Sequence, residues 1–160
     1  MRLILAIFCL LAGTATGLYR SAELKKRERL LSEVVGLLES MAVQIRYREL
    51  PLGDLFGVLS GGAFLQRTID NSGFTMNNWR SAWNAAADEL FTVDGDREIL
   101  LSIGNALGGS DTAGQIAMLE LNRELLQARL REAAEMSARK GAMYRSVGLL
   151  TGLGLAVIVI

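Results

Sequence analysis

Acidic side chains are the residues of this chain whose spacing comes nearest to a chemical site. Asp94, Asp96 and Glu98 alternate at the start of a helical pattern, and carboxylate oxygens of this kind bind Ca²⁺ or Mg²⁺. They lack the remaining ligands of an oxygen-rich loop, so stabilisation of a helix start explains them better than a metal does. Asp88 and Glu89 are adjacent, and neighbours on a helix point about 100° apart. They are therefore poorly placed to act as a paired acid and base.

Other catalytic signatures are missing. Histidine is absent, and the single cysteine, Cys9, lies inside an apolar run. This excludes histidine acid–base catalysis, Cys/His metal sites and an internal disulfide. Gly108, Gly109 and Ser110 precede a helical pattern, but the P-loop lysine is missing, so a helix stop followed by a cap is the better interpretation. We expect no catalytic residues, cofactor or metal, and no enzymatic activity.

The apolar content of the chain is concentrated at its two ends. The 160 residues are 51% hydrophobic with a mean hydropathy of +0.29, in a length that suits one domain. Residues 3–19 and 146–160 carry no charge, and each stretch is near the lower limit of about 17 residues for crossing a bilayer. The sequence predicts an N-terminal transmembrane segment over 1–19, a helical domain over 20–145 and a C-terminal transmembrane segment over 146–160.

Basic residues flank both apolar segments on the side of the central domain. Five follow the first segment and three precede the second: Arg20, Lys25, Lys26, Arg27, Arg29, Arg139, Lys140 and Arg145. The positive-inside rule then predicts a cell-membrane protein whose central domain lies in the cytoplasm. A cleaved signal peptide is the alternative, because small residues surround Ala15. Cleavage there would leave a secreted or periplasmic helical binding domain.

The central region has helical periodicity and no strand alternation of useful length. Glycine, proline and serine divide it into segments, and we predict an all-α helical bundle of about six helices. The first helix continues from the N-terminal segment to about residue 50 and the last begins at Ser110 or Asp111; the four between them cover 51–60, 63–71, 75–91 and 94–107. Thr75 and Asp94 are the expected N-caps of the helices that they begin.

Four apolar faces are expected to form the core. Trp79 and Trp83 fit a core better than an exposed anchor for a partner, because short helices need large apolar area to dock. Arg123 interrupts the face on the last helix. The faces consist of Leu24, Leu31, Val34, Leu38, Met41 and Ile45; Trp79, Trp83, Ala86 and Leu90; Ile99, Ile103, Ala106 and Leu107; and Ile116, Leu119, Leu126, Leu130 and Ala133.

Charge is balanced overall but not locally. Seventeen basic and seventeen acidic residues give no net charge, which argues against a nucleic-acid partner. Residues 49–111 carry nine acidic and three basic residues, whereas the flanking regions are basic. This segment is expected to meet a basic protein surface. The predicted partner-binding residues are Asp88, Glu89, Asp94, Asp96 and Glu98.

Two glycine pairs mark the apolar segments. Gly13 and Gly17 in the first, and Gly148 and Gly152 in the second, are each four residues apart, as in close helix packing within lipid. Either the two segments pack on each other or they pack on another subunit. Glycine is also common in membrane helices without such a role.

Several short segments together resemble one known family. The run 50–56 at a helix start, the segments 79–83 and 95–100, the turn 107–111 and the closing stretch 144–150 are similar, in order and spacing, to stage III sporulation protein AB. The resemblance covers essentially the whole chain. It implies a fold like the cytoplasmic domain of the type II secretion platform protein F. It also implies a part in a channel complex between mother cell and forespore, on the mother-cell side, with a secretion-type ATPase and other channel-complex proteins as partners. The family offers no catalytic residues to transfer.

Overall fold

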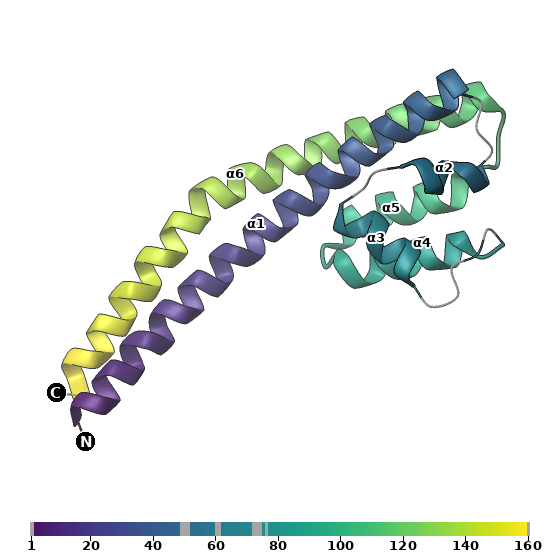
Figure 1. The fold of residues 1–160 in the computed structure, drawn as a ribbon. Helices are drawn as coiled ribbons and strands as arrows, with labels where there is room; N and C mark the ends of the chain where they lie inside the picture. The colour runs from purple at the N-terminus through teal and green to yellow at the C-terminus, as the bar shows by residue number, and fades with distance from the viewer. Residues whose placement is uncertain (1, 49–51, 60–61, 72–74, 76, 160) are drawn as a thin grey trace. The chain divides into compact units, whose positions relative to one another are not determined.

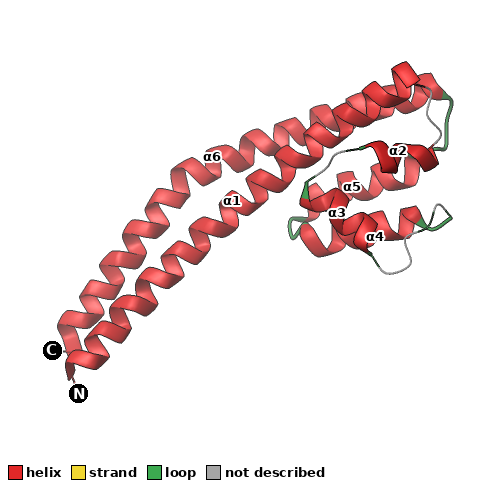
Figure 2. Ribbon diagram, viewed as in Figure 1, coloured by secondary structure: helices red, strands yellow, loops and turns green. Residues whose placement is uncertain are grey.

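The computed structural model describes residues 2–48, 52–59, 62–71, 75 and 77–159. Within these ranges every regular element is a helix, and Figure 2 contains no strand. The all-α prediction is confirmed, and so is the expected number of helices (Figure 1): α1 Arg2–Arg48, α2 Leu52–Val58, α3 Ala63–Asp70, α4 Trp79–Leu90, α5 Asp94–Ala106 and α6 Thr112–Val159.

The chain divides into two compact units. The first, here called the hairpin unit, consists of Met1–Glu28 and Arg131–Ile160. The second, the bundle unit, consists of Arg29–Leu130. Helices α1 and α6 contribute to both units, whereas α2 to α5 belong to the bundle unit alone.

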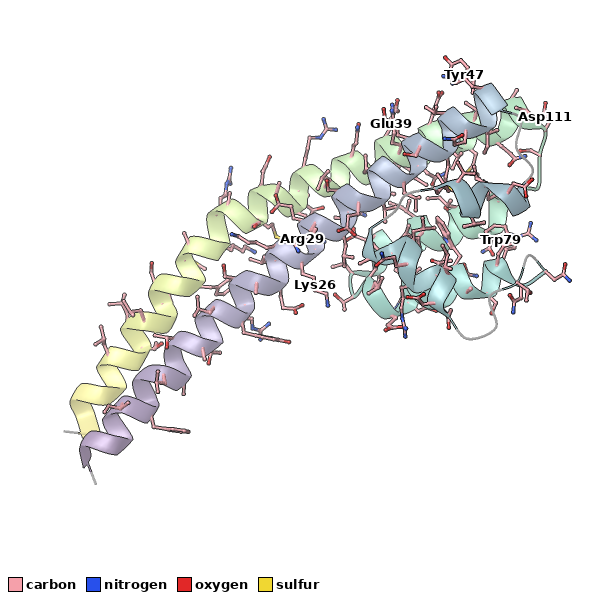
Figure 3. All side chains as sticks on the ribbon, viewed as in Figure 1. Lys26, Arg29, Glu39, Tyr47, Trp79 and Asp111 are labelled. Atoms are coloured by element: carbon pink, nitrogen blue, oxygen red, sulfur yellow. The ribbon has the colours of Figure 1, made fainter. Side chains whose placement is uncertain are left out.

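In the bundle unit, α1 and α6 lie side by side and contribute the predicted apolar faces (Figure 1). On α1 the side chains of Leu31, Val34, Leu38 and Met41 are fully buried, as predicted. On α6, Leu119 and Leu126 are fully buried, while Ile116 and Leu130 are only half-buried. Figure 3 shows Trp79 within the layer of short helices, whereas Glu39 and Tyr47 project from α1 away from that layer.

An aromatic cluster joins the short helices. Helix α4 packs against both α3 and α5. The ring of Phe64 lies edge-on to Trp83 with centroids 4.7 Å apart, and 5.9 Å from Phe91. The Trp83 indole N–H donates to the Leu100 carbonyl at 2.8 Å. The prediction that both tryptophans are core is confirmed, since Trp79 and Trp83 are buried.

The predicted inner face of α5 is partly wrong. Ile103 and Leu107 are buried, but Ala106 is exposed and Ile99 is only half-buried. Leu100 and Gly104 complete the buried face instead, because α5 approaches α4 closely at Gly104. A Cβ atom at Gly104 would lie 2.6 Å from Cδ1 of Trp83. Only glycine fits this crossing without a shift of the indole.

The N-caps of α4 and α5 differ from the prediction, whereas the start of α6 agrees with it. Helix α4 begins at Trp79 with Asn78 as N-cap, and Thr75 instead donates its N–H and Oγ1–H to the Asn78 side-chain oxygen. Asp94 is the first helical residue of α5, after Val93. Asp111 does cap α6, because its Oδ1 accepts the Gly114 N–H at 3.0 Å. Gly108 has φ 80°, which confirms the predicted stop after α5.

In the hairpin unit, the N-terminal part of α1 and the C-terminal part of α6 run side by side in opposite directions (Figure 1). The side chains of residues 1–6, 9–10 and 155–160, which belong to the predicted transmembrane segments, lie outside the described residues. Among the described residues, no helix combines enough length with enough apolar character to span a membrane.

Candidate partner-binding surfaces

Four of the five predicted partner-binding residues are exposed around the α4–α5 connection. Asp88 and Glu89 lie in the last turn of α4, and Asp94 and Glu98 lie near the start of α5. Only Phe91, Thr92 and Val93 separate the two helices. Because α4 and α5 also pack on each other, these four side chains share one region of the bundle unit. They are called the acidic surface below.

Two arginines within the bundle unit already contact this acidic surface. Arg97 lies 2.7 Å from Asp94 and 3.7 Å from Asp88, measured between nitrogen and carboxylate oxygen. Arg67 of α3 lies 2.6 Å from Glu89. For Glu98, no ion pair is found among the residues that the structure describes. The acidic surface therefore holds four carboxylates against two guanidinium groups, and half-exposed pairs of this kind bind weakly enough to rearrange.

Asp96 does not belong to this surface, contrary to the prediction. It is only 1% exposed, and its carboxylate lies 3.9 Å from Nε of Arg129 on α6. A Cβ atom at Gly95 would lie 2.6 Å from Nη2 of the same arginine, so the guanidinium covers the start of α5. Asp96 therefore links α5 to α6 and is not available to a partner. The sequence contained the signal, because residues two apart on a helix point about 200° apart.

The divergence of these carboxylates also bears on metal binding. Asp94 is exposed and Asp96 is buried, so the alternating acids do not converge on one point. Within the described part of the chain, no group of three or more histidine, cysteine or acidic residues is arranged to hold a metal ion.

A second candidate surface is the helix crossing of the hairpin unit. A Cβ atom at Gly17 would lie 2.5 Å from the Tyr144 carbonyl oxygen and 3.2 Å from the Cα atom of Gly148. A Cβ atom at Gly148 would lie 2.7 Å from the Gly13 carbonyl oxygen. Three of the four predicted glycines therefore meet, with backbone against backbone. The surroundings of Gly152 lie outside the described residues.

The crossing continues through small polar residues that the sequence pattern did not single out. Ser21 and Ser137 are buried, and the Ser21 hydroxyl oxygen would lie 3.3 Å from a Cβ atom at Gly141. The four-residue steps from Gly17 to Ser21 and from Ser137 to Gly141 were the available signal. Small residues thus line the crossing for more than one helical turn on each helix.

Comparison with known proteins adds the family. Residues 2–160 match the profile of the family described as stage III sporulation protein AB. The chain belongs to this family. A similar protein, the stage III sporulation protein AB of Bacillus subtilis (strain 168), is 24% identical over 163 residues, which cover 96% of this chain and 95% of the relative. No solved structure gives a significant match.

Family membership confirms the resemblance noted in the sequence and supports a role in sporulation. The match to the stage III sporulation protein AB family extends through both the hairpin unit and the bundle unit. The expected similarity to a type II secretion platform protein stays a prediction, since no solved structure matches.

Proposed function

We propose that this chain is a membrane-anchored, non-enzymatic component of a secretion-like channel complex required for endospore formation, and that its bundle unit docks a cytoplasmic ATPase. The main support for this proposal is the match to a sporulation family, which covers both units. In addition, the hairpin unit exposes large apolar side chains. The channel and the ATPase are what the family resemblance implies.

The outward side chains of the hairpin unit support membrane anchoring. The exposed large apolar residues there range from 46% exposed at Leu153 to 70% at Phe8. Transfer of apolar area out of water is favourable by about 25 cal/mol per Å². The inner seam is formed by glycine and serine, which is typical of helix pairs packed in lipid. A lipid surrounding accounts for both features.

Basic residues beside the apolar segments support a cytoplasmic bundle unit. Arg20, Lys25 and Lys26 on α1 and Arg139 and Lys140 on α6 are exposed. Cations retained on the cytoplasmic side orient membrane helices. Under this proposal, the bundle unit faces the mother-cell cytoplasm and the acidic surface meets a basic surface of the ATPase.

Protease protection tests the anchoring and the orientation. In intact sporulating cells, residues 20–145 should resist added protease and should become digestible after lysis, and alkaline carbonate should not extract the protein. Intact mass distinguishes the alternative, because a secreted binding domain requires loss of the residues before about Ala15. Digestion of the bundle unit in intact cells, or a mature chain shortened near Ala15, would contradict the proposal.

Charge neutralisation tests the ATPase contact. D94N/E98Q removes two exposed carboxylates of the acidic surface, and D70N/E124Q removes one Asp and one Glu exposed elsewhere in the bundle unit. At low salt, the first variant should associate with the secretion-type ATPase on the order of tenfold more slowly, because charges steer encounter. High salt should remove most of the difference.

The second variant controls for net charge, since it changes the charge of the chain by the same amount. Tryptophan fluorescence checks that both variants retain the fold, because Trp79 and Trp83 lie in the bundle unit. Equal slowing by both variants would attribute the effect to overall charge. An unchanged rate for D94N/E98Q would place the contact elsewhere.

A further inference from the structure

Two basic clusters that are more than 110 residues apart in sequence meet in the hairpin unit. The crossing fixes their register, because Gly17 lies against Gly148 and Ser21 lies near Gly141. Arg20 therefore neighbours the crossing on α1, and Arg139 and Lys140 neighbour it on α6. Sequence periodicity could not establish this juxtaposition, since it depends on how the two helices are paired.

The exposed cations occupy a narrow level of the hairpin. Arg20, Lys25 and Lys26 span six residue steps of α1, a rise of about 9 Å. Arg139 and Lys140 precede Gly141, which lies near Ser21 within the same level. All five side chains are exposed, and Figure 3 shows Lys26 projecting from α1. These five residues are called the cation ring. Glu23 and Glu135 are the exposed acids close to it.

Apolar side chains begin directly beside the cation ring. Leu18 is 57% exposed, and Met143 and Val147 on α6 are about half exposed. Tyr19 is 65% exposed and lies between Leu18 and Arg20 in the sequence of α1. An aromatic residue with a polar tip at such a boundary is typical of the level of lipid headgroups.

We propose that the cation ring binds the phosphate groups of anionic phospholipids, so that the hairpin unit selects these lipids from a mixed bilayer. This inference rests on the proposed membrane anchoring. Cations close to a negatively charged lipid surface are each worth about a fivefold change in binding. A nucleic acid would leave the neighbouring apolar side chains in water, so a surface that is both anionic and apolar fits better.

Lipid selectivity can be measured on the full chain reconstituted into phosphatidylcholine vesicles. Trace spin-labelled phosphatidylglycerol or phosphatidylcholine is added, and electron paramagnetic resonance gives the fraction of each lipid that is motionally restricted by the protein. The expected result is several-fold stronger association of phosphatidylglycerol than of phosphatidylcholine. Raised salt should reduce that preference, since screening weakens contacts with exposed charges.

A matched pair of variants locates the selectivity. R20Q/R139Q removes one ring arginine from each helix. R29Q/R131Q removes an exposed arginine that lies eight or nine residues, about two turns, from the first on each helix and farther from the apolar segments. The first variant should lose most of this several-fold preference, since each cation is worth about a fivefold change in binding, and the second should keep it. If both variants lost the lipid preference equally, the preference would come from the overall positive charge of the hairpin and not from the cation ring.

The outcomes separate this inference from the anchoring on which it rests. If both lipids are restricted equally by the parent protein, the hairpin contacts lipid but does not select anionic headgroups, and the inference is wrong. If neither lipid is restricted, the membrane anchoring itself is wrong. A preference that survives R20Q/R139Q unchanged would also overturn the cation ring as its source.

Discussion

The hairpin unit and the bundle unit distribute residue types in opposite ways. In the hairpin, the inner seam is made of Gly17, Ser21, Gly141 and Gly148, and large apolar side chains face outward. In the bundle, side chains as large as Trp83 are fully buried, and the exposed surface carries charged residues together with scattered apolar ones such as Leu121. Because α1 and α6 contribute to both units, one helix can satisfy two different surroundings along its length. The residue types on the inner and outer faces of α1 and α6 change from one unit to the other, while the backbone stays helical in both.

Close helix approach occurs in both units but against different neighbours. At Gly17 and Gly148, a Cβ atom would meet backbone atoms of the opposite helix. At Gly104, it would meet the Trp83 indole and the Asn84 side chain. A backbone neighbour can move only if the whole helix moves, whereas a side chain can change rotamer. The two crossings should therefore respond differently to the same substitution.

The largest expected effect comes from placing a charge in the bundle core. Leu38 is fully buried, so Leu38→Asp takes a carboxylate out of water and should cost several kcal/mol of a total stability of about 5–15 kcal/mol. The bundle unit should unfold while the hairpin remains. Tryptophan fluorescence measures this selectively, because Trp79 and Trp83 both lie in the bundle unit.

Leu121→Asp is the matched control. Leu121 is 59% exposed on α6, so the same substitution should leave the fluorescence and the urea midpoint nearly unchanged. A similar loss of stability in both variants would mean that the inner and outer faces of the bundle have been assigned wrongly.

A substitution at the hairpin crossing should separate its helices. In Gly148→Ala, the new methyl group would lie within 3 Å of backbone atoms of Gly13 and Gly17, and overpacking of this kind costs about 1–3 kcal/mol. Spin labels at Leu18 and Leu149, in a background with Cys9 replaced by Ser, should report a longer distance by pulsed electron paramagnetic resonance.

Gly154→Ala provides the control within the same unit. Among the described residues, nothing lies within 4 Å of a Cβ atom at Gly154, so the distance between the labels should not change. An unchanged distance in Gly148→Ala as well would show that the two helices do not cross at this glycine.

At Gly104, where α5 crosses α4, a glycine-to-alanine substitution should move the helices less than Gly148→Ala does in the hairpin. Gly104→Ala places a methyl group against the Trp83 indole, which a hydrogen bond to Leu100 holds in place. We expect destabilisation by about 1–2 kcal/mol and a changed tryptophan emission, because the gain in helix propensity offsets part of the overpacking.

Gly36→Ala measures the gain in helix propensity without any overpacking. In the part of the chain that the structure describes, nothing lies within 4 Å of a Cβ atom at Gly36, so this variant should be more stable by up to about 1 kcal/mol. A stabilised Gly104→Ala variant would mean that the indole moves aside at little cost.

The sequence predicted the bundle core well because large apolar residues repeat with the helical period. Leu31, Val34, Leu38 and Trp83 follow directly from that periodicity. Ala106 was misassigned because alanine fits either an inner or an outer face. Caps were less predictable: Thr75 bonds Asn78 and leaves the capping position to it. Local hydrogen-bonding side chains compete for these positions, and sequence alone does not rank them.

Contacts between distant segments were out of reach of the sequence. The contact of Asp96 with Arg129 depends on how α5 lies against α6, and the cation ring depends on the pairing of α1 with α6. The glycine spacing indicated that a close crossing exists but left open whether its partner is the other terminal segment. Residue pairs across a helix interface carry no periodic signal, so only the coordinates place them.

The smallest expected effect concerns the ion pairs on the outer side of α1 and α6 in the bundle. Arg46 and Glu120 lie 2.6 Å apart, but their side chains are 47% and 48% exposed. Water solvates both groups when the pair is broken, so Glu120→Gln should cost less than about 1 kcal/mol. A double-mutant cycle with Arg46→Gln, followed by urea unfolding and tryptophan fluorescence, gives the coupling energy directly. If the coupling exceeded the cost of Gly104→Ala, exposed charges and not buried apolar packing would dominate the bundle, and the contrast with the hairpin would lose its basis.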